Sequence, residues 1–212
     1  MVEAYLRQSP LARLGLAARA ALDAAKGDAG AVMTEHVDRG QIVVRGDAAT
    51  AAFREAAANA LGITLPVEPN TVSGPTNLAD GPRALWLGPD EWLLVTAPGR
   101  SDTTAQALRA AFAGQFAIAV NASDARAVIG LSGPKARAVL MKGCALDLHP
   151  RVSGPGQCAQ TLLARAGVIL HQTTFDKATG AAVYDIYVLR SYVEYLWAWI
   201  EDAAQEYGYK IV

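Results

Sequence analysis

The side chains best suited to nucleophilic or metal chemistry are three histidines and two cysteines, namely His36, His149, His171, Cys144 and Cys158. No two histidines stand four residues apart, the spacing that places two metal ligands on one side of a helix. The cysteines lack the close pairing of a zinc site and are too few for a disulfide framework. We therefore expect surface or packed histidines and free, buried thiols.

A glycine-rich turn is the second candidate for chemistry. Residues 130–134 read Gly-Leu-Ser-Gly-Pro, follow a β-prone run and precede a helical pattern, as phosphate-binding turns do. The segment has neither the Gly-x-Gly-x-x-Gly of dinucleotide-binding folds nor the Lys-Ser/Thr ending of a P-loop. Pro134 also lacks an amide that could bind an anion. The segment is therefore predicted to be a tight strand-to-helix turn.

The remaining charged pairs also favour structural roles. Asp90 and Glu91 are adjacent, so in a strand their carboxylates point to opposite faces and do not converge as an acid–base pair. The pairs formed by Asp and Arg at 124 and 126, and at 147 and 151, are expected to lie at the surface. A Gly-x-Ser-x-Gly nucleophile motif is missing. These residues predict no catalytic, cofactor-binding or metal site in this chain.

The four tryptophans are Trp86, Trp92, Trp197 and Trp199. Aromatic side chains are common anchors of protein interfaces, but the core is the more frequent place for each of them. We expect core positions. If a partner binds, then Trp86, Trp92, Trp197 and the loop at residues 66–82 are the first places to look for its contact surface.

Composition narrows the class of protein. The chain has 212 residues, of which 52% are hydrophobic and 18% charged, as in ordinary globular domains. Its 19 basic and 20 acidic side chains give a net charge of -1, which argues against nucleic acid as a partner. The opening residues lack the order of a secretory signal, and no apolar run is long enough to span a membrane. We expect a cytoplasmic protein with no membrane partner.

The elements that must position these residues occur in a repeat. Residues 41–47 predict a short strand and 48–61 a helix with an apolar face. Residues 126–131 predict a second such strand, followed by a helix that begins near Pro134 and ends at Gly143. Aligning Gly46 with Gly133 gives an offset of 133 − 46 = 87 residues.

Each copy continues with a strand and a second helix. In the first copy these are residues 91–96 and 102–112, and in the second 184–189 and 191–206. Ser191 and Glu194 have the spacing of a capping box at the start of the last helix, where Tyr195, Trp199 and Ala203 indicate an apolar face. The runs 84–87 and 162–170 are expected to be return strands.

This order predicts an α+β fold with two related βαβ-type lobes and mixed or antiparallel sheets. We expect an N-terminal arm at residues 1–35, a first lobe at 36–118 and a second at 119–212, with the boundary within 114–123. The proline- and glycine-rich segment 66–82 is expected to be a long and mobile loop.

Several strings in order resemble known proteins. The segments 128–142, 147–148, 164–170 and 185–188 resemble the folate-binding region of the glycine-cleavage T-protein, an aminomethyltransferase. A closer resemblance is to the gamma subunit of heterotetrameric sarcosine oxidase. It is carried by five strings: LGPDEWLL (87–94), LSGP (131–134), KGCALDLHP (142–150), CAQT (158–161) and YLW (195–197). The expected fold is therefore that of the aminomethyltransferase folate-binding domain.

The resemblance implies a subunit of an oxidoreductase complex. That complex oxidatively demethylates sarcosine to glycine, forms hydrogen peroxide and passes the one-carbon unit to tetrahydrofolate. It implies that FAD, FMN, NAD, zinc and tetrahydrofolate belong to the partner chains alpha, beta and delta, with alpha as the direct contact of this chain.

Departures from the T-protein pattern indicate a non-catalytic role. T-proteins carry Asn-Asp-Val after the first helix, with a catalytic aspartate, where this chain reads Leu-Gly-Ile-Thr at 61–64. Their Arg-Thr-Gly-Tyr-Thr-Gly-Glu motif corresponds here to residues 171–177 and 182–184. We therefore expect a structural gamma subunit, since a fold alone does not confer function. The alternative is a freestanding folate-binding module of the aminomethyltransferase type.

Overall fold

The computed structural model describes residues 8–212, and the chain forms two compact units. Unit 1 consists of the described part of Met1–Val37 together with Arg126–Ser153 and Thr161–Val212. Unit 2 consists of Asp38–Ala125 and Gly154–Gln160. Each unit therefore contains segments that are distant in sequence.

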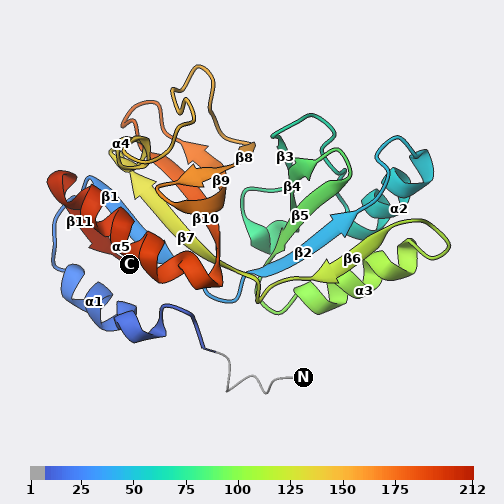
Figure 1. Cartoon of the computed structure of the whole chain (residues 1–212), viewed down its shortest axis with the longest axis horizontal. Coiled ribbons are helices and arrows are strands. Elements are labelled where there is room, and N and C mark those ends of the chain that lie inside the picture. Colours follow the sequence, from blue (N-terminus) through green and yellow to red (C-terminus); the bar gives the residue numbers. More distant parts are fainter. Residues whose placement is uncertain (1–7) are drawn as a thin grey trace. The chain divides into compact units, whose positions relative to one another are not determined.

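Unit 2 is built on a five-stranded sheet in the order β3-β4-β5-β2-β6 (Figure 1). Its elements are β2 (Gly40–Arg45), α2 (Ala51–Leu61), β3 (Val72–Ser73), a 3₁₀ turn (Leu78–Asp80), β4 (Arg83–Gly88), β5 (Glu91–Thr96), α3 (Ser101–Ala111) and β6 (Ile118–Asn121). Alternate strand residues such as Ile42 and Trp92 face the two helices, where they pack with Phe53 and Leu108. This layer is the core of the unit.

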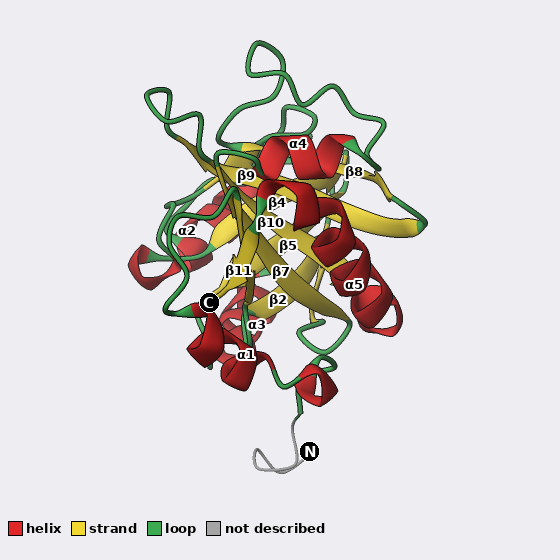
Figure 2. Cartoon of the chain, turned by 90° about the vertical axis from the view of Figure 1, so that its left-hand side faces the viewer, coloured by secondary structure: helices red, strands yellow, loops and turns green. Residues whose placement is uncertain are grey.

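Unit 1 is built on a six-stranded sheet in the order β11-β1-β7-β10-β9-β8. Its elements are a 3₁₀ turn (Ala12–Leu14), α1 (Leu16–Asp23), β1 (Ala31–Glu35), β7 (Arg126–Gly133), α4 (Ala136–Met141), β8 (Gln157–Leu163, whose first residues belong to unit 2), β9 (Ala166–Phe175), β10 (Ala182–Leu189), α5 (Val193–Ala204) and β11 (Tyr209–Ile211), with 3₁₀ turns at Arg190–Tyr192 and Gln205–Tyr207. Figure 2 shows α4 and α5 in front of this sheet. Tyr184, Ile186 and Val188 of β10 face these helices and pack with Leu196 and Trp197.

The element order confirms the predicted α+β fold with two related lobes. One copy runs β2, α2, β3, β4, β5, α3, β6 and the other β7, α4, β8, β9, β10, α5, β11. Corresponding strands occupy the same places in the two sheets, except that β1 lies between β7 and β11 in the second. The offset of 87 residues therefore reflects a structural repeat.

The described part of the segment expected to be an N-terminal arm belongs to unit 1. Leu11 is only 1% exposed and packs in the core of that unit. Asp23 accepts a hydrogen bond from the Ile211 amide at 2.9 Å, and Arg13 pairs with Glu194 of α5 at 2.7 Å. The segment thus contributes a helix and a strand instead of standing apart.

Three local expectations were wrong. Ser191 and Glu194 do not form a capping box: α5 begins at Val193 after a 3₁₀ turn, and the Glu194 carboxylate binds Arg13. The run 162–170 is not one strand, because the chain turns at Ala164, which has φ of 53°, between β8 and β9. The segment 114–123 is not a connector but contains β6, and the chain enters unit 1 after residue 125.

The loop at residues 66–82 is held by buried side chains. Trp92 donates from its indole nitrogen to the Pro66 carbonyl at 2.7 Å, and Arg83 donates to the Pro75 carbonyl at 3.0 Å. Both donors are buried, and the loop contains β3 and a 3₁₀ turn. These bonds fix the backbone of a segment that composition alone predicted to be mobile.

Candidate functional site

The glycine-rich turn between β7 and α4 is occupied by backbone contacts. Gly133 has φ of 115°, and a Cβ there would lie 2.7 Å from the Gly30 carbonyl oxygen. The amide of Lys135, which a phosphate could have used, donates to the same Gly30 carbonyl at 2.8 Å. This geometry supports the predicted structural turn, because the amide is directed at the protein itself.

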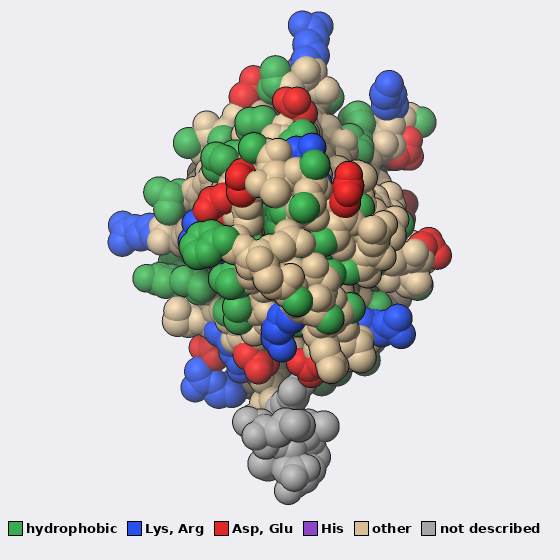
Figure 3. Space-filling view, turned by 90° about the vertical axis from the view of Figure 1, so that its right-hand side faces the viewer, with side chains coloured by type: hydrophobic (Ala, Val, Ile, Leu, Met, Phe, Trp, Pro, Cys, Tyr) green, Lys and Arg blue, Asp and Glu red, His purple; other side chains and the backbone are tan. Residues whose placement is uncertain are grey.

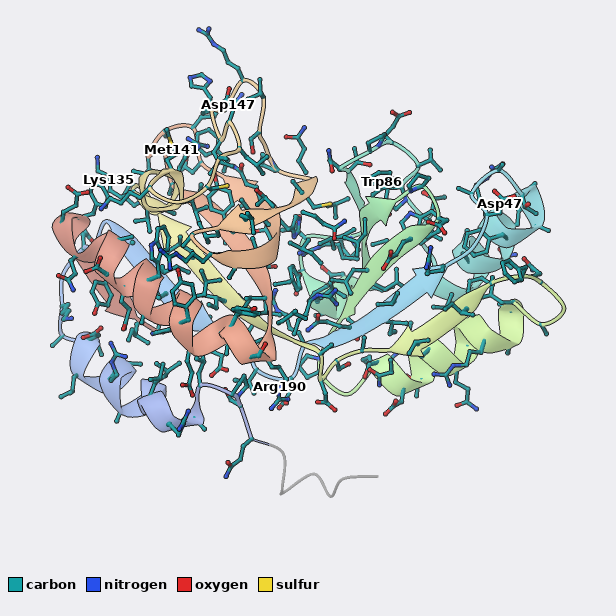
Figure 4. The ribbon with its side chains drawn as sticks, viewed as in Figure 1. Asp47, Trp86, Lys135, Met141, Asp147 and Arg190 are labelled. Atoms are coloured by element: carbon teal, nitrogen blue, oxygen red, sulfur yellow. The ribbon has the colours of Figure 1, made fainter. Side chains whose placement is uncertain are left out.

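The sequence-adjacent carboxylates lie at the surface. Asp90 is in the turn before β5 and pairs with Arg45 at 2.5 Å, and this hydrogen bond raises the pKa of Arg45. Glu91 begins β5. Asp147 accepts a hydrogen bond from the His149 amide at 2.8 Å. Figure 4 labels Asp147 on the loop that follows α4. None of these contacts brings two carboxylates together for acid–base work.

The two cysteines are free and buried, as predicted. Cys158 is 3% exposed, and burial raises the pKa of its thiol to about 12. Its sulfur donates to the Trp86 carbonyl at 3.4 Å. A thiol with this pKa is protonated at neutral pH and is a poor nucleophile.

Two histidines and an aspartate come together in unit 1. His36 Nε2 lies 3.3 Å from Asp185 Oδ1, and His171 Nδ1 lies 3.9 Å from Asp185 Oδ2. Asp185 and His171 are each 2% exposed, and they are direct cross-strand neighbours on β10 and β9. The carboxylate therefore lies between two imidazoles in a buried place, where a polar group needs partners within the protein.

Gly130 makes this cluster possible. It pairs with Asp185 across β7 and β10, and a Cβ on it would lie 2.6 Å from His36 Nε2. His36 follows β1, passes over this glycine and so reaches Asp185. The histidines were visible in the sequence, but their approach to Asp185 was not. They meet only after the strands that carry them take their places in the sheet. No spacing along the chain carries that signal.

Burial of Asp185 and His171 limits the reactions in which this cluster could take part. An aspartate can orient a histidine that acts as a base, and the side chain of His36 is 28% exposed. Asp185 and His171 are closed to solvent and also hold other contacts within the protein. Across residues 8–212, no group of three or more His, Cys, Asp or Glu side chains is arranged to hold a metal ion. The cluster is best described as a buried polar network.

The tryptophans divide into two classes. Trp92 and Trp197 are fully buried in the cores of units 2 and 1, so the suggestion that they line a partner surface was wrong. Trp86 and Trp199 are partly buried. Figure 4 labels Trp86 on β4. Only these two indoles remain available to a partner.

The positions that correspond to T-protein site residues have structural roles here. Leu61 is 7% exposed in the core of unit 2, and Gly62 ends α2 with φ of 71°. In the turn between β9 and β10, Asp176 accepts hydrogen bonds from the Ala178 amide at 2.8 Å and the Thr179 hydroxyl at 2.7 Å. These bonds lower the pKa of Asp176, with the Thr179 bond the larger cause. At the positions where T-proteins carry polar site residues, this chain therefore has residues that end a helix or close a turn.

The surface carries charges of both signs. Figure 3 shows lysine, arginine, aspartate and glutamate side chains spread over the visible face without a patch of one sign. Such a face lacks the basic stripe of a nucleic-acid-binding domain. Within residues 8–212 no helix is both long and apolar enough to cross a membrane.

Comparisons with known proteins place these features in context. The family model "Sarcosine oxidase, gamma subunit family" matches residues 45–206. A sarcosine oxidase subunit gamma from Corynebacterium sp. (strain U-96) is 33% identical over 205 residues, which are 96% of this chain and 92% of that protein.

Two solved structures are similar in fold. A chain of the heterotetrameric sarcosine oxidase from Corynebacterium sp. U-96, in complex with pyrrole 2-carboxylate, has a TM-score of 0.82 and 31% identity, covering 95% of this chain and 96% of that one. The glycine cleavage system aminomethyltransferase T from Bartonella henselae has a TM-score of 0.64 and 16% identity, covering 87% of this chain and 48% of that one. The second likeness concerns the fold alone and bears out the expected aminomethyltransferase-like architecture.

Proposed function

Because the chain belongs to the sarcosine oxidase gamma subunit family, we propose that it is the non-catalytic gamma subunit of a heterotetrameric sarcosine oxidase. The complex would be a cytoplasmic oxidoreductase that demethylates sarcosine to glycine, forms hydrogen peroxide and passes the one-carbon unit to tetrahydrofolate. The observation that carries the proposal is the match over 95% of this chain to a chain of such a heterotetramer.

The contacts made by potentially reactive groups support a non-catalytic role for this chain. The Cys158 thiol is buried and protonated, the Lys135 amide binds the protein backbone, and Asp185 is enclosed between His36 and His171. These three groups are engaged in contacts within the fold. The chain would therefore act by packing on the subunits that carry out the reaction.

The proposal assigns the cofactors to the partner subunits. FAD, FMN, NAD, zinc and tetrahydrofolate would be held by the alpha, beta and delta chains, and alpha would be the direct contact of this chain. Support for this division comes from the family resemblance and from the absence, in the sequence at 61–64, of the acid that T-proteins carry.

Co-purification tests the proposal. The chain would be tagged, co-expressed with the alpha, beta and delta subunits of the same organism and recovered by affinity. We expect all three subunits in the eluate, a flavin absorption spectrum, and hydrogen peroxide formed on addition of sarcosine. Recovery of the tagged chain alone, without flavin, would contradict the proposal.

Two histidine variants separate a packing role from a catalytic one. In the purified complex, His36→Gln and the exposed control His149→Gln should give the same sarcosine turnover per flavin as the unchanged complex. A selective loss of turnover in His36→Gln, with subunit content unchanged, would assign chemistry to this chain.

The freestanding folate module is the competing outcome. Titration of the isolated chain with tetrahydrofolate, followed by tryptophan fluorescence, should show no saturable change. Saturable quenching, together with failure to recover a flavoprotein, would replace the subunit proposal with the folate module.

A further inference from the structure

Large apolar side chains are concentrated at the outer strand of unit 2. Phe116 is fully exposed at 105%, Ile118 is 51% exposed and Val120 is 49% exposed. Val43 of the neighbouring strand is partly exposed. We call these four residues the β6 surface. Scattered apolar residues are ordinary on a protein surface, but a group within five consecutive positions requires an explanation.

Strand geometry places Ile118, Val120 and Val43 on one face of the sheet, and Phe116 lies two residues before β6. Ala119 is 3% exposed and packs with the helices, so Ile118 and Val120 on either side of it point to the opposite face. Val43 stands directly opposite Val120 in the antiparallel pair of β2 and β6. Side chains at directly opposite positions contact each other, which makes the apolar area continuous across the two strands.

The backbone edge of β6 is partly blocked. β6 is the last strand in the sheet order, so its outward amides and carbonyls have no neighbouring strand among residues 8–212. Arg109 of α3 donates from Nε to the outward Ala119 carbonyl at 2.8 Å. A charged side chain at an edge is a common device against strand addition. The surface therefore offers side chains to a partner instead of a pairing edge.

One charged side chain lies within the same face. Arg45 stands directly opposite Ile118 and is paired within the unit with Asp90 at 2.5 Å, and Asn121 at the end of β6 donates to Asp102 at 2.7 Å. Apolar side chains beside an internally paired arginine are complementary to an apolar surface without strong charge, and charged residues are depleted at the centres of protein interfaces. A strongly charged partner surface would gain little binding energy from contact with the β6 surface.

Resting on the proposed function, we propose that the β6 surface is where this chain packs on a larger subunit of the sarcosine oxidase complex. The occupant is an uncharged, apolar patch of that subunit, which covers Ile118, Val120 and Phe116 by side-chain contact. Family membership supports a subunit as the occupant, because the matching solved chain comes from a heterotetramer. Exposure of such a strand in a free chain favours self-association, a cost that an obligate partner removes.

The test compares two valine substitutions in the co-expressed complex. Val120→Glu puts a charge in the β6 surface, and Val152→Glu, at a valine 57% exposed in unit 1, is the matched control. Subunit stoichiometry and the dissociation constant for the other subunits are measured by affinity recovery and interferometry. We expect Val120→Glu to weaken binding about tenfold or more, since an unpaired buried charge is costly, and Val152→Glu to leave it unchanged.

Each other result has a distinct meaning. If both variants bind the other subunits equally well, the β6 surface is not the contact with a larger subunit, but the proposed function is unaffected. If the unchanged chain recovers no partner subunit, the proposed function itself fails. If light scattering shows that the isolated chain dimerises and Val120→Glu abolishes only that dimer, then a second copy is the occupant. Circular dichroism verifies folding, and Ile118→Lys replaces Val120→Glu if the latter unfolds.

Discussion

At the scale of single residues, polar groups that look reactive are used to fasten strands and turns. Asp185 joins two histidines, Asp176 closes a hairpin turn, and Asp23 ties α1 to β11. The carboxylates of Asp176 and Asp23 accept hydrogen bonds, which offset the cost of placing them against the protein. Such residues affect stability and its pH dependence before they affect any reaction.

Cys158 should resist alkylation in the folded protein. Burial keeps its thiol protonated, with a pKa of about 12, and alkylation requires the thiolate. Iodoacetamide treatment at pH 8, followed by peptide mass spectrometry, should label Cys158 only after denaturation. Rapid labelling of this cysteine in the native chain would show that its environment is open.

Asp23 should contribute stability that disappears in acid. A hydrogen bond with Lys26, and then one from the Ile211 amide, lower its pKa from the ordinary value. Because the pKa is lower in the folded chain, the contribution is present above the unfolded pKa and is lost as the pH falls through the folded pKa, that is, below about pH 4.

Thermal melts between pH 7 and pH 3 measure this contribution. Asp23→Asn should melt below the unchanged protein at neutral pH, and the difference should shrink in acid. Asp28→Asn, at an exposed position of the same segment, is the control and should not reproduce the effect. A difference that stays constant over the whole range would rule out the carboxylate as its source.

At the scale of elements, glycines decide how closely strands and side chains approach. Gly133 allows the β7 to α4 turn to contact Gly30, and Gly130 leaves room for His36 above the sheet. Neither role follows from the residues next to the glycine in sequence. Both follow from the strand that the fold brings alongside.

Gly130→Ala should therefore destabilise unit 1. The new Cβ would lie 2.6 Å from His36 Nε2, which has to move away from Asp185. Because the atoms that must shift are the end of a partly exposed side chain, the cost should be at the low end of overpacking, about 1 kcal/mol in the free energy of unfolding, measurable by urea denaturation. Gly167→Ala is a matched control on β9, because no atom lies within 4 Å of its new Cβ. Equal stability of the two variants would contradict the proposed role of Gly130.

At the scale of the whole molecule, the first and last segments of the described residues 8–212 belong to one unit. β1 from the first part of the chain lies between β7 and β11, and α1 packs beside the last strand. Unit 2 is made almost entirely from the middle of the sequence. The described residues of the expected N-terminal arm are thus part of a core and not an attachment to it.

Leu11→Ala tests this integration. Leu11 is 1% exposed in the core of unit 1, so its truncation should lower the free energy of unfolding by about 2 to 5 kcal/mol. Leu22→Ala, in the same segment but 78% exposed, should change it little. Chemical denaturation of both variants decides the matter. If Leu11→Ala leaves the free energy of unfolding unchanged, the segment around Leu11 is dispensable for folding.

The repeat was predictable because it depends on local patterns. Apolar periodicity, Gly143 at the end of the second helix and the proline after Gly133 act within a few residues. The strands and helices from 41 to 61 and from 126 to 142 could therefore be located. Boundaries failed where a distant side chain intervened, as when Arg13 bound Glu194 and the capping box did not form.

The amino-acid sequence by itself determined the α+β class, the internal repeat and the resemblance to the gamma subunit family, because these depend on local periodicity and on strings of neighbouring residues. Only the tertiary structure decided that His36, His171 and Asp185 meet, that Trp92 and Trp197 are core residues, and that apolar side chains of β6 are exposed. These outcomes depend on strand order and register. Both are set by packing between segments far apart in the chain, where spacing along the sequence carries no information.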